Sequence, residues 1–139
     1  MLVHASCVAI ERYAILLRGP SGGGKSDLAL RLIDDGAALV ADDQVLLKAD
    51  GLGLTASAPA ALSGLLEVRG IGIVRCDVVA SAPVRLVIDL DAASPIQRMP
   101  DSEVCALLGI EVPRITLNPF EPSTPAKIRI ALRACLVQR

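Results

Sequence analysis

The residues with the clearest chemical potential are the eight from Gly19 to Ser26, which read GPSGGGKS. They match the pattern G-x-x-x-x-G-K-[ST] at every fixed position. Glycines let the backbone wrap closely, so that successive N–H groups point at phosphate oxygens. Lys25 would reach the β- and γ-phosphates, and the Ser26 hydroxyl would bind Mg²⁺. The predicted phosphate-binding residues are Gly19, Pro20, Ser21, Gly22, Gly23, Gly24, Lys25 and Ser26.

Two adjacent carboxylates, Asp42 and Asp43, follow the apolar run ALVA. If that run is a strand, they stand at its carboxyl end, where ligands bind in open α/β sheets. One carboxylate would hold Mg²⁺, and the other would accept the proton of an attacking hydroxyl. A solvated turn is the alternative, because aspartates are common in turns.

A second charged pair, Glu67 and Arg69, is embedded among apolar residues in LEVRGIGIV (residues 66–74). In a strand, both side chains would point to the same face. They would then either form an ion pair or present an anion and a cation to one ligand. The residue types leave both alternatives open.

These side chains require a strand, a loop and a helix to position them. Residues 13–18 (YAILLR) predict a short buried strand before the glycine loop. Residues 25–35 predict an amphipathic helix after it, and Gly36 stands where a helix is expected to end. The next apolar run, which ends at Ala41, predicts a second strand. This order opens an α/β nucleotide-binding unit.

Beyond the two aspartates, the pattern predicts shorter elements. They are a hairpin over residues 45–57 that turns at Ala49–Gly51, a short helix and tight turn in residues 58–74, strands at 84–90 and 113–117, and a helix at 124–138. Pro113 predicts that its strand lies at a sheet edge. Ser123 or Thr124 would cap the last helix. We expect an α/β P-loop fold with a mixed sheet and few flanking helices, in a single domain over residues 1–139.

The composition of the 139 residues excludes several other classes of protein. Apolar residues make up 53% and charged residues 21%, which argues against disorder. The net charge of −1 provides no field for holding a nucleic-acid backbone. Aromatic residues are 1%, namely Tyr13 and Phe120, which is too few for a platform that stacks single-stranded nucleic acid. The four cysteines lie far apart, and the one histidine forms no zinc motif with them.

The same sequence predicts a cytoplasmic protein that does not bind membranes. Its longest weakly charged run, residues 51–66, contains glycines and Pro59 and is too short to span a bilayer. The first residues lack a basic region, and Glu11 and Arg12 interrupt the apolar residues early, so we expect no signal peptide.

Together these residues resemble the catalytic domain of HPr kinase/phosphorylase, a bacterial enzyme family that phosphorylates a serine of the phosphocarrier HPr. Four ordered pieces carry the resemblance: His4, GPSGGGKS, the Ala-Asp-Asp at residues 41–43, and LEVRGIGIV. The last piece is close to the family's own signature, which P-loop proteins at large lack. The resemblance covers nearly the whole chain and implies a P-loop kinase fold of the phosphoenolpyruvate-carboxykinase-like type.

The resemblance also implies a role for each matching residue. His4 is similar to the family's active-site histidine, and Lys25 and Ser26 to its P-loop lysine and metal-binding serine. Asp42 and Asp43 match an acidic pair that supplies the proton acceptor and a metal contact, and the two roles are not divided between them.

Two further matches complete the expected site. Glu67 is similar to an additional Mg²⁺ ligand, so the expected metal ligands are Ser26, Asp43 and Glu67. Arg98, in the short stretch IQRMP, is similar to a catalytic arginine. The implied cofactors are ATP and Mg²⁺, the implied partner is HPr of the phosphotransferase system, and the implied assembly is a homo-oligomer, in this family a hexamer.

Two departures from the family pattern are visible. Longer members carry an additional N-terminal domain, whereas this chain begins almost at His4, so we expect a short form of the family. The family's Pro-Gly-Arg-Asn stretch, linked to dephosphorylation, is replaced by the run LNPFEPSTPAKIRIALR. We therefore expect serine phosphorylation of HPr and leave the reverse reaction open. The alternatives are a nucleotide-binding regulatory module without transferase activity and a small-molecule P-loop kinase.

The helix expected at residues 124–138 carries Lys127, Arg129 and Arg133. These basic side chains would form part of a surface on which HPr docks. Packing of the helix on its own sheet is the alternative.

Overall fold

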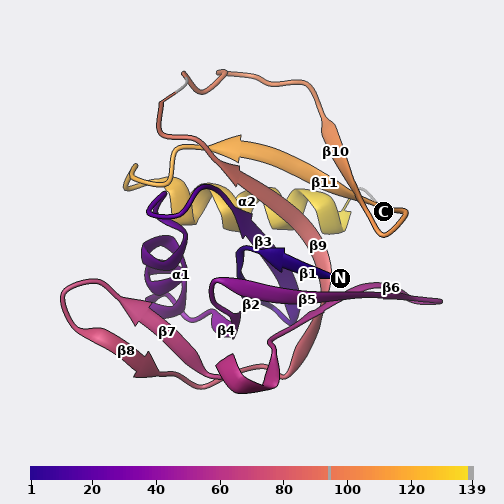
Figure 1. Ribbon diagram of the computed structural model, residues 1–139. Helices are drawn as coiled ribbons and strands as arrows, with labels where there is room; N and C mark the ends of the chain where they lie inside the picture. The colour runs from indigo at the N-terminus through magenta and orange to yellow at the C-terminus, as the bar shows by residue number, and fades with distance from the viewer. Residues whose placement is uncertain (94, 138–139) are drawn as a thin grey trace.

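The computed structural model describes residues 1–93 and 95–137 (Figure 1). The elements, in chain order, are β1 (Leu2–His4), β2 (Ser6–Ile10), β3 (Tyr13–Arg18), α1 (Lys25–Asp34), β4 (Ala38–Ala41), β5 (Gln44–Asp50), β6 (Gly53–Ser57), the 3₁₀ turn η1 (Ala60–Leu62), β7 (Leu65–Val68), β8 (Gly72–Arg75), β9 (Ser81–Leu90), β10 (Glu103–Leu107), β11 (Ile110–Leu117) and α2 (Thr124–Val137). This is a mixed α/β fold with a large sheet and two α-helices among the described residues, as expected.

The main sheet follows the order β1-β5-β6-β9-β3-β2-β4, and β11 lies against β9 with β10 beyond it. Strand β9 is shared by two parts of the sheet. Its beginning pairs antiparallel with β6, while its later residues pair parallel with β3 on one side and β11 on the other. The parallel strands β3, β9 and β11 therefore end at one edge of the sheet. A separate hairpin is formed by β7 and β8.

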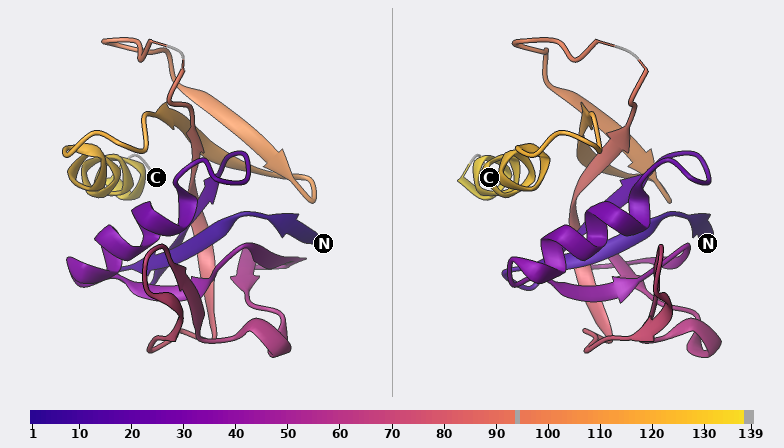
Figure 2. Two further views of the ribbon diagram at one scale, coloured as in Figure 1. Left: turned by 60° about the vertical axis from the view of Figure 1, so that its left-hand side comes forward. Right: turned by 90° about the vertical axis from the view of Figure 1, so that its left-hand side faces the viewer.

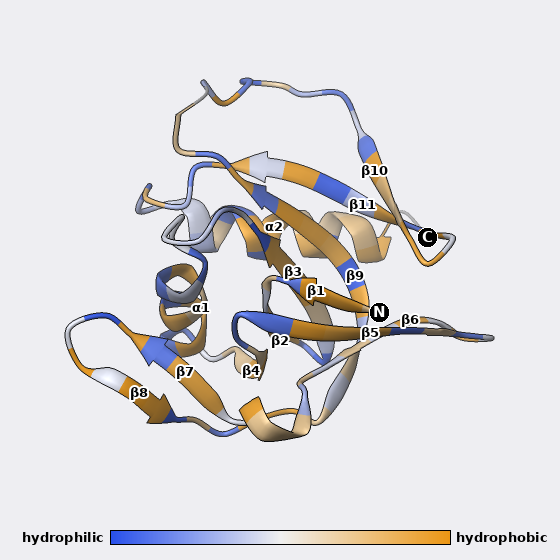
Figure 3. Cartoon of the chain, in the orientation of Figure 1, coloured by the Kyte–Doolittle hydropathy of each residue, from blue (hydrophilic) through white to orange (hydrophobic). Residues whose placement is uncertain are grey.

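Alternation along the central strands builds a core on each face of the sheet. In β3, Ile15 and Leu17 join a cluster that includes residues of both helices, whereas Ala14 and Leu16 join a second cluster built from strands. Figure 3 shows that β3 and most of β9 are hydrophobic. Because both faces are covered, the strand before the glycine loop is fixed in place.

Helices α1 and α2 lie on the same face of the sheet, as the two turned views in Figure 2 show. Leu28 and Leu32 of α1, and Ile128 and Leu132 of α2, enter the same buried cluster. Arg129 of α2 also donates hydrogen bonds to carbonyl oxygens in the last turn of α1 and just beyond it. The second helix therefore packs against α1 and the sheet.

Several expectations about the elements are confirmed. The strand at residues 13–18, the helix beginning at Lys25 and the strand ending at Ala41 are present at those positions. Gly36 follows α1 with a φ of 108°, which is the left-handed conformation that glycine tolerates. The hairpin of β5 and β6 is also present, although its turn lies at residues 51–52, slightly later than expected.

Other expectations were wrong. The strand containing Pro113 is not at the sheet edge, because β10 pairs beyond it. The short helix and tight turn expected in residues 58–74 are present as η1 and the turn at residues 69–71, but the pairing of β7 with β8 around that turn was not expected. Of the two expected cap residues, Thr124 is already inside α2 and its hydroxyl donates to the Asn118 carbonyl oxygen, 2.5 Å away. Ser123 directly precedes the helix, and its carbonyl oxygen accepts the Lys127 N–H. The last residue of the expected helix, Gln138, is outside the described residues.

Candidate active site

The glycine loop joins the end of β3 to the start of α1. Gly24 precedes the helix with a φ of 93°, a conformation that side chains bearing Cβ rarely adopt. At Gly23, a Cβ would lie 2.7 Å from the Pro20 carbonyl oxygen, which accepts the Gly23 N–H at 2.9 Å. The glycines are therefore needed for the tight path that exposes the first amides of α1.

Lys25 is the first residue of α1 and is 6% exposed. Its ammonium group donates to the carbonyl oxygens of Gly19 at 2.9 Å and Pro20 at 3.0 Å. These bonds hold the positive charge inside the loop, where a polyphosphate would bind.

Asp42 is buried and connects three parts of the fold. Its Oδ1 accepts the hydroxyl of Ser26 from α1 and the hydroxyl of Ser6 from β2, each at 2.7 Å. Its Oδ2 accepts the Glu67 backbone N–H at 3.1 Å. Asp42 therefore orients the Ser26 hydroxyl beside the phosphate loop and holds β7 against the site.

Asp43 has a different environment from its neighbour. It has a φ of 68°, and its side chain is 65% exposed. Its Oδ1 lies 2.8 Å from Nε2 of His4, a residue that β1 brings beside it by pairing with β5. The adjacent carboxylates thus have separate partners, and one of them is open to an incoming group.

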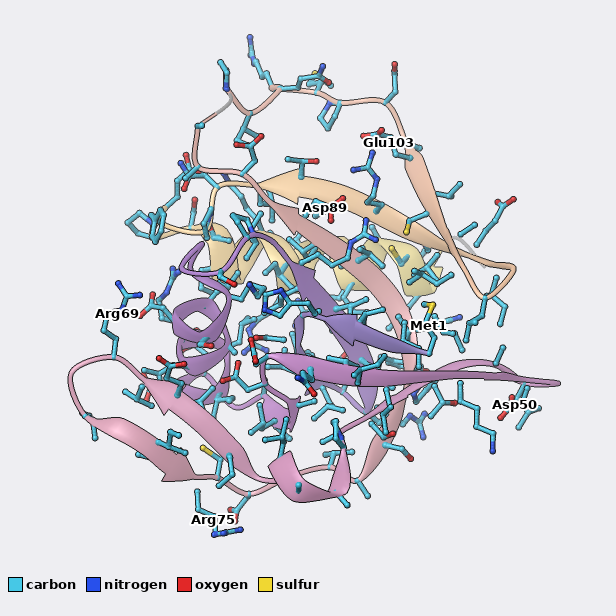
Figure 4. The ribbon with its side chains drawn as sticks, viewed as in Figure 1. Met1, Asp50, Arg69, Arg75, Asp89 and Glu103 are labelled. Carbon is cyan, nitrogen blue, oxygen red and sulfur yellow. The ribbon has the colours of Figure 1, made fainter. Side chains whose placement is uncertain are left out.

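A cleft of about 540 Å³ joins these residues. Lys25, Ser26, Asp43, Glu67 and Arg69 are among the residues that line it. Arg69 belongs to the turn after β7 and points away from the molecule's centre in Figure 4. Since no Glu67–Arg69 ion pair occurs among the described residues, the structure favours two side chains facing one cleft.

The oxygen atoms around this cleft fit a magnesium ion. Ser26, Asp43 and Glu67 line it together, and Asp42 orients the serine hydroxyl. Within residues 1–93 and 95–137, no group of three or more His, Cys, Asp or Glu side chains forms a ready-made metal cage. Magnesium commonly takes one or two carboxylates, waters and substrate phosphates, so this donor set suits it.

The structure does not bring Arg98 into the site. It is an exposed residue between β9 and β10, and it lines neither this cleft nor the second one described below. Of the five residues expected to be catalytic, the structure brings His4, Lys25, Asp42 and Asp43 together and leaves Arg98 outside.

A second cleft, of about 680 Å³, also borders the glycine loop and was not anticipated. Arg18 and Arg114 both bond to Asp89 there, with their closest contacts at 2.7 Å, and Arg114 also reaches Glu103. Figure 4 shows Asp89 and Glu103 on β9 and β10. Burial disfavours ionisation of Asp89, but its hydrogen bonds and attraction to the two arginines prevail and lower its pKa.

Sequence reasoning also missed Ser6 and Phe120. Ser6 is an isolated serine before an apolar run, and nothing in its surroundings indicates that its hydroxyl reaches Asp42. Phe120 lines both clefts. The sequence signal that could have drawn attention to Phe120 is that it is one of only two aromatic residues in the chain.

Comparison with known proteins agrees with this arrangement. The family described as HPr serine kinase C-terminal domain matches residues 1–128. The chain belongs to this family. HPr kinase/phosphorylase of Geobacillus thermodenitrificans is 34% identical over 95% of the chain, and that of Chlorobium phaeobacteroides is 33% identical over 84%. The chain spans about half the length of these curated relatives, 46% and 40% respectively.

A solved structure gives the same result for the fold. The structure of the HPr(Ser) kinase/phosphatase from Coxiella burnetii is 30% identical, with a TM-score of 0.86. The match covers 99% of this chain and 97% of that one. The family resemblance noted from the four sequence pieces is thus confirmed. No helix among the described residues is long and apolar enough to cross a membrane.

Proposed function

We propose that this domain is a Mg²⁺-dependent ATP:protein serine phosphotransferase that acts on HPr or an HPr-like carrier, as a P-loop kinase of the phosphoenolpyruvate-carboxykinase-like type. The observation that carries this proposal is the convergence of Lys25, Ser26, Asp42 and the His4–Asp43 pair beside one phosphate loop. A module that only binds nucleotide would not need an exposed carboxylate paired with a histidine at this place.

In this mechanism, the loop amides and Lys25 bind the β- and γ-phosphates of ATP. The serine hydroxyl of the partner attacks the γ-phosphorus as the bond to the β–γ bridging oxygen breaks, which releases ADP. Asp43, which is exposed in the cleft, accepts the hydroxyl proton, and His4 orients its carboxylate.

Asp42 has the other role, because it is buried and already accepts the Ser26 hydroxyl. It keeps a lone pair of that hydroxyl directed into the cleft. Ser26 and Glu67 would hold magnesium. Asp43 lines the same cleft, so its carboxylate would be a third ligand. The ion, when bound, neutralises phosphate charge. Arg98 remains a prediction from the resemblance.

The direct test is incubation of the protein with labelled ATP, Mg²⁺ and purified HPr, followed by analysis for acid-stable phosphoserine. We expect phosphoserine on HPr that disappears when Mg²⁺ is chelated. Binding of ATP without any transfer to HPr would favour a regulatory nucleotide-binding module. Transfer to a free small molecule, but not to HPr, would favour a small-molecule kinase. Adding inorganic phosphate to phosphorylated HPr would test the reverse reaction.

A further inference from the structure

The second cleft at the glycine loop has no role in the function proposed above. It is lined by the loop itself, by Leu90 at the end of β9 with the three residues that follow it, and by Thr116 near the end of β11. It meets the metal-side cleft at Gly22 and Phe120, which line both. Its volume of about 680 Å³ is in the range of small-ligand sites.

The position of this cleft favours a ligand that extends from the phosphate loop. Strands β3, β9 and β11 are parallel, and their carboxyl ends meet beside the cleft. Ligands of open α/β sheets bind at this kind of edge. The other side of the loop, with Asp43 and Glu67, is occupied by the phosphoryl-transfer groups. The remainder of a nucleotide therefore has room on the β9 and β11 side.

Phe120 stands at the junction of the two clefts. It is the only phenylalanine in the chain, and it is 59% exposed. Its ring lies directly on the loop, since a Cβ built on Gly24 would be 3.1 Å from it. An exposed aromatic face next to a phosphate site can stack a nucleobase.

The segment that carries Phe120 is held rigidly. The Phe120 N–H donates to Oδ1 of Asn118 at 2.8 Å, which forms a local turn. Arg31 of α1 donates to the carbonyl oxygens of Pro119 and Glu121. The ring is thus fastened to the same helix that begins at the phosphate loop, so a base would meet a preformed surface.

The charges of the cleft favour an uncharged group over a second polyanion. Its four charged lining residues are Arg18, Asp89, Asp91 and Arg114, whose formal charges cancel. The two arginines are already bonded to Asp89. A nucleoside, with its neutral base and ribose, suits this lining better than a phosphorylated effector does.

We propose that this cleft takes the nucleoside of ATP, with the base stacked on Phe120. This inference rests on the nucleotide binding proposed above and adds the position of the base. The Mg²⁺ complex of inorganic tripolyphosphate is the discriminating probe, because it has the phosphates of ATP and no nucleoside.

The experiment measures the affinities of ATP and tripolyphosphate by titration calorimetry. In the wild type, we expect ATP to bind more tightly than tripolyphosphate. Phe120→Ala should weaken ATP binding about 5- to 150-fold, the range for loss of one base–aromatic stack, and leave tripolyphosphate binding unchanged. Phe120→Trp should retain the preference for ATP. The chain has no tryptophan of its own, so the fluorescence of this variant would come from the introduced residue. ATP should quench that fluorescence, and tripolyphosphate should not.

Matched substitutions identify the cleft that receives the base. Ala93→Gln extends a neutral side chain into the second cleft and should reduce the preference for ATP over tripolyphosphate. Arg69→Gln introduces the same residue on the metal-side cleft and should leave that preference unchanged, because any effect on phosphate applies to both ligands.

Four results would overturn the inference. Equal weakening of both ligands by Phe120→Ala would mean that the ring only supports the glycine loop. Equal affinity of the wild type for both ligands would mean that no base site exists, while phosphate binding would stand. Failure of the wild type to bind either ligand would overturn the proposed function together with this inference. If Phe120→Ala lost HPr phosphorylation but bound ATP as the wild type does, Phe120 would instead be assigned to partner docking.

Discussion

In the proposed mechanism, Lys25 is the side chain that would contact the β- and γ-phosphates most directly. We expect Lys25→Ala to lower the rate of phosphoryl transfer by about 10²-fold or more, because a positive charge facing the β- and γ-phosphates is removed. Initial rates with HPr at saturating ATP measure this. Lys48→Ala is the matched control, since Lys48 is an exposed lysine on β5. Near-wild-type turnover of folded Lys25→Ala would contradict the phosphotransfer mechanism.

The two aspartates should be separable by kinetics. Asp43→Asn should lower kcat by about 10²- to 10⁴-fold with little change in ATP affinity, because it removes the proton acceptor. Asp42→Asn should instead raise the Mg²⁺ concentration needed for half-maximal activity. The amide cannot accept both the serine hydroxyls and the Glu67 N–H, so the Ser26 hydroxyl is less firmly oriented. Full activity in both variants would show that the two aspartates only form a turn and take no part in catalysis.

At this scale, sequence patterns predict most of the residues that the structure brings together at the candidate site. The motif and the Asp-Asp pair predict Lys25, Ser26 and the carboxylates, because their chemistry is local in the chain. The division of labour between Asp42 and Asp43 is not local. It depends on Ser6 and His4, which lie 36 and 39 residues away and are positioned by strand pairing. Short polar residues in apolar runs give no signal of such long-range bonds.

Among the elements, β3, β9 and β11 are tied at their carboxyl ends by Arg18, Asp89 and Arg114. The lowered pKa of Asp89 means that the folded state holds its charge at a pH where the unfolded chain takes up a proton. The associated stability is present above the ordinary value of 3.8 and is lost as pH falls below it.

The corresponding prediction concerns Asp89→Asn. This variant should be less stable than the wild type at pH 7, and the difference should shrink as the pH falls from about 4 toward 2. Urea unfolding at a series of pH values measures it. Arg114→Lys keeps the positive charge but loses the forked geometry of the guanidinium. Its stability at pH 7 should therefore lie between that of the wild type and that of Asp89→Asn. A constant difference across this range would contradict a role for the Asp89 charge.

The elements near the motif are predictable because their signals are strong. A glycine run marks the loop, and a three-to-four-residue apolar period marks α1. Strands β1, β2, β7, β8 and β10 are missed, because strands of three to five residues carry too little periodicity of their own. The equally short β4 is found only because it follows the loop and helix of the motif. The edge position predicted for Pro113 was wrong because its missing N–H is a local property, whereas the edge is decided by whether β10 pairs beyond it.

For the molecule as a whole, the proposed function requires a surface on which a partner such as HPr would dock. Lys127 is paired with Glu121, and Arg129 donates to carbonyls at the end of α1, so these two cations have structural partners. Arg133 is exposed on α2. Of the three basic residues considered from sequence, Arg133 is the one best suited to contact a partner.

We therefore expect Arg133→Glu to slow phosphorylation of intact HPr several-fold and to leave ATP affinity unchanged. Lys48→Glu makes the same charge reversal on the β5–β6 hairpin and should have little effect. Wild-type protein should also phosphorylate intact HPr much faster than a peptide of its target site, because a folded partner positions its own hydroxyl. Equal rates on HPr and the peptide would exclude recognition by docking.

Because β9 pairs antiparallel with one strand and parallel with two others, it should be the last part of the sheet to open in local fluctuations. Its ten residues pair with β6, β3 and β11, so opening of any one of these strands leaves β9 paired with the other two. Amide hydrogens in the middle of β9 should therefore exchange with solvent only when the whole domain unfolds. The β7–β8 hairpin, which pairs only with itself, should exchange through local opening. Deuterium uptake by these two segments would thus report global and local stability separately, and uptake would fall in the hairpin alone if a ligand bound at Glu67 orders it.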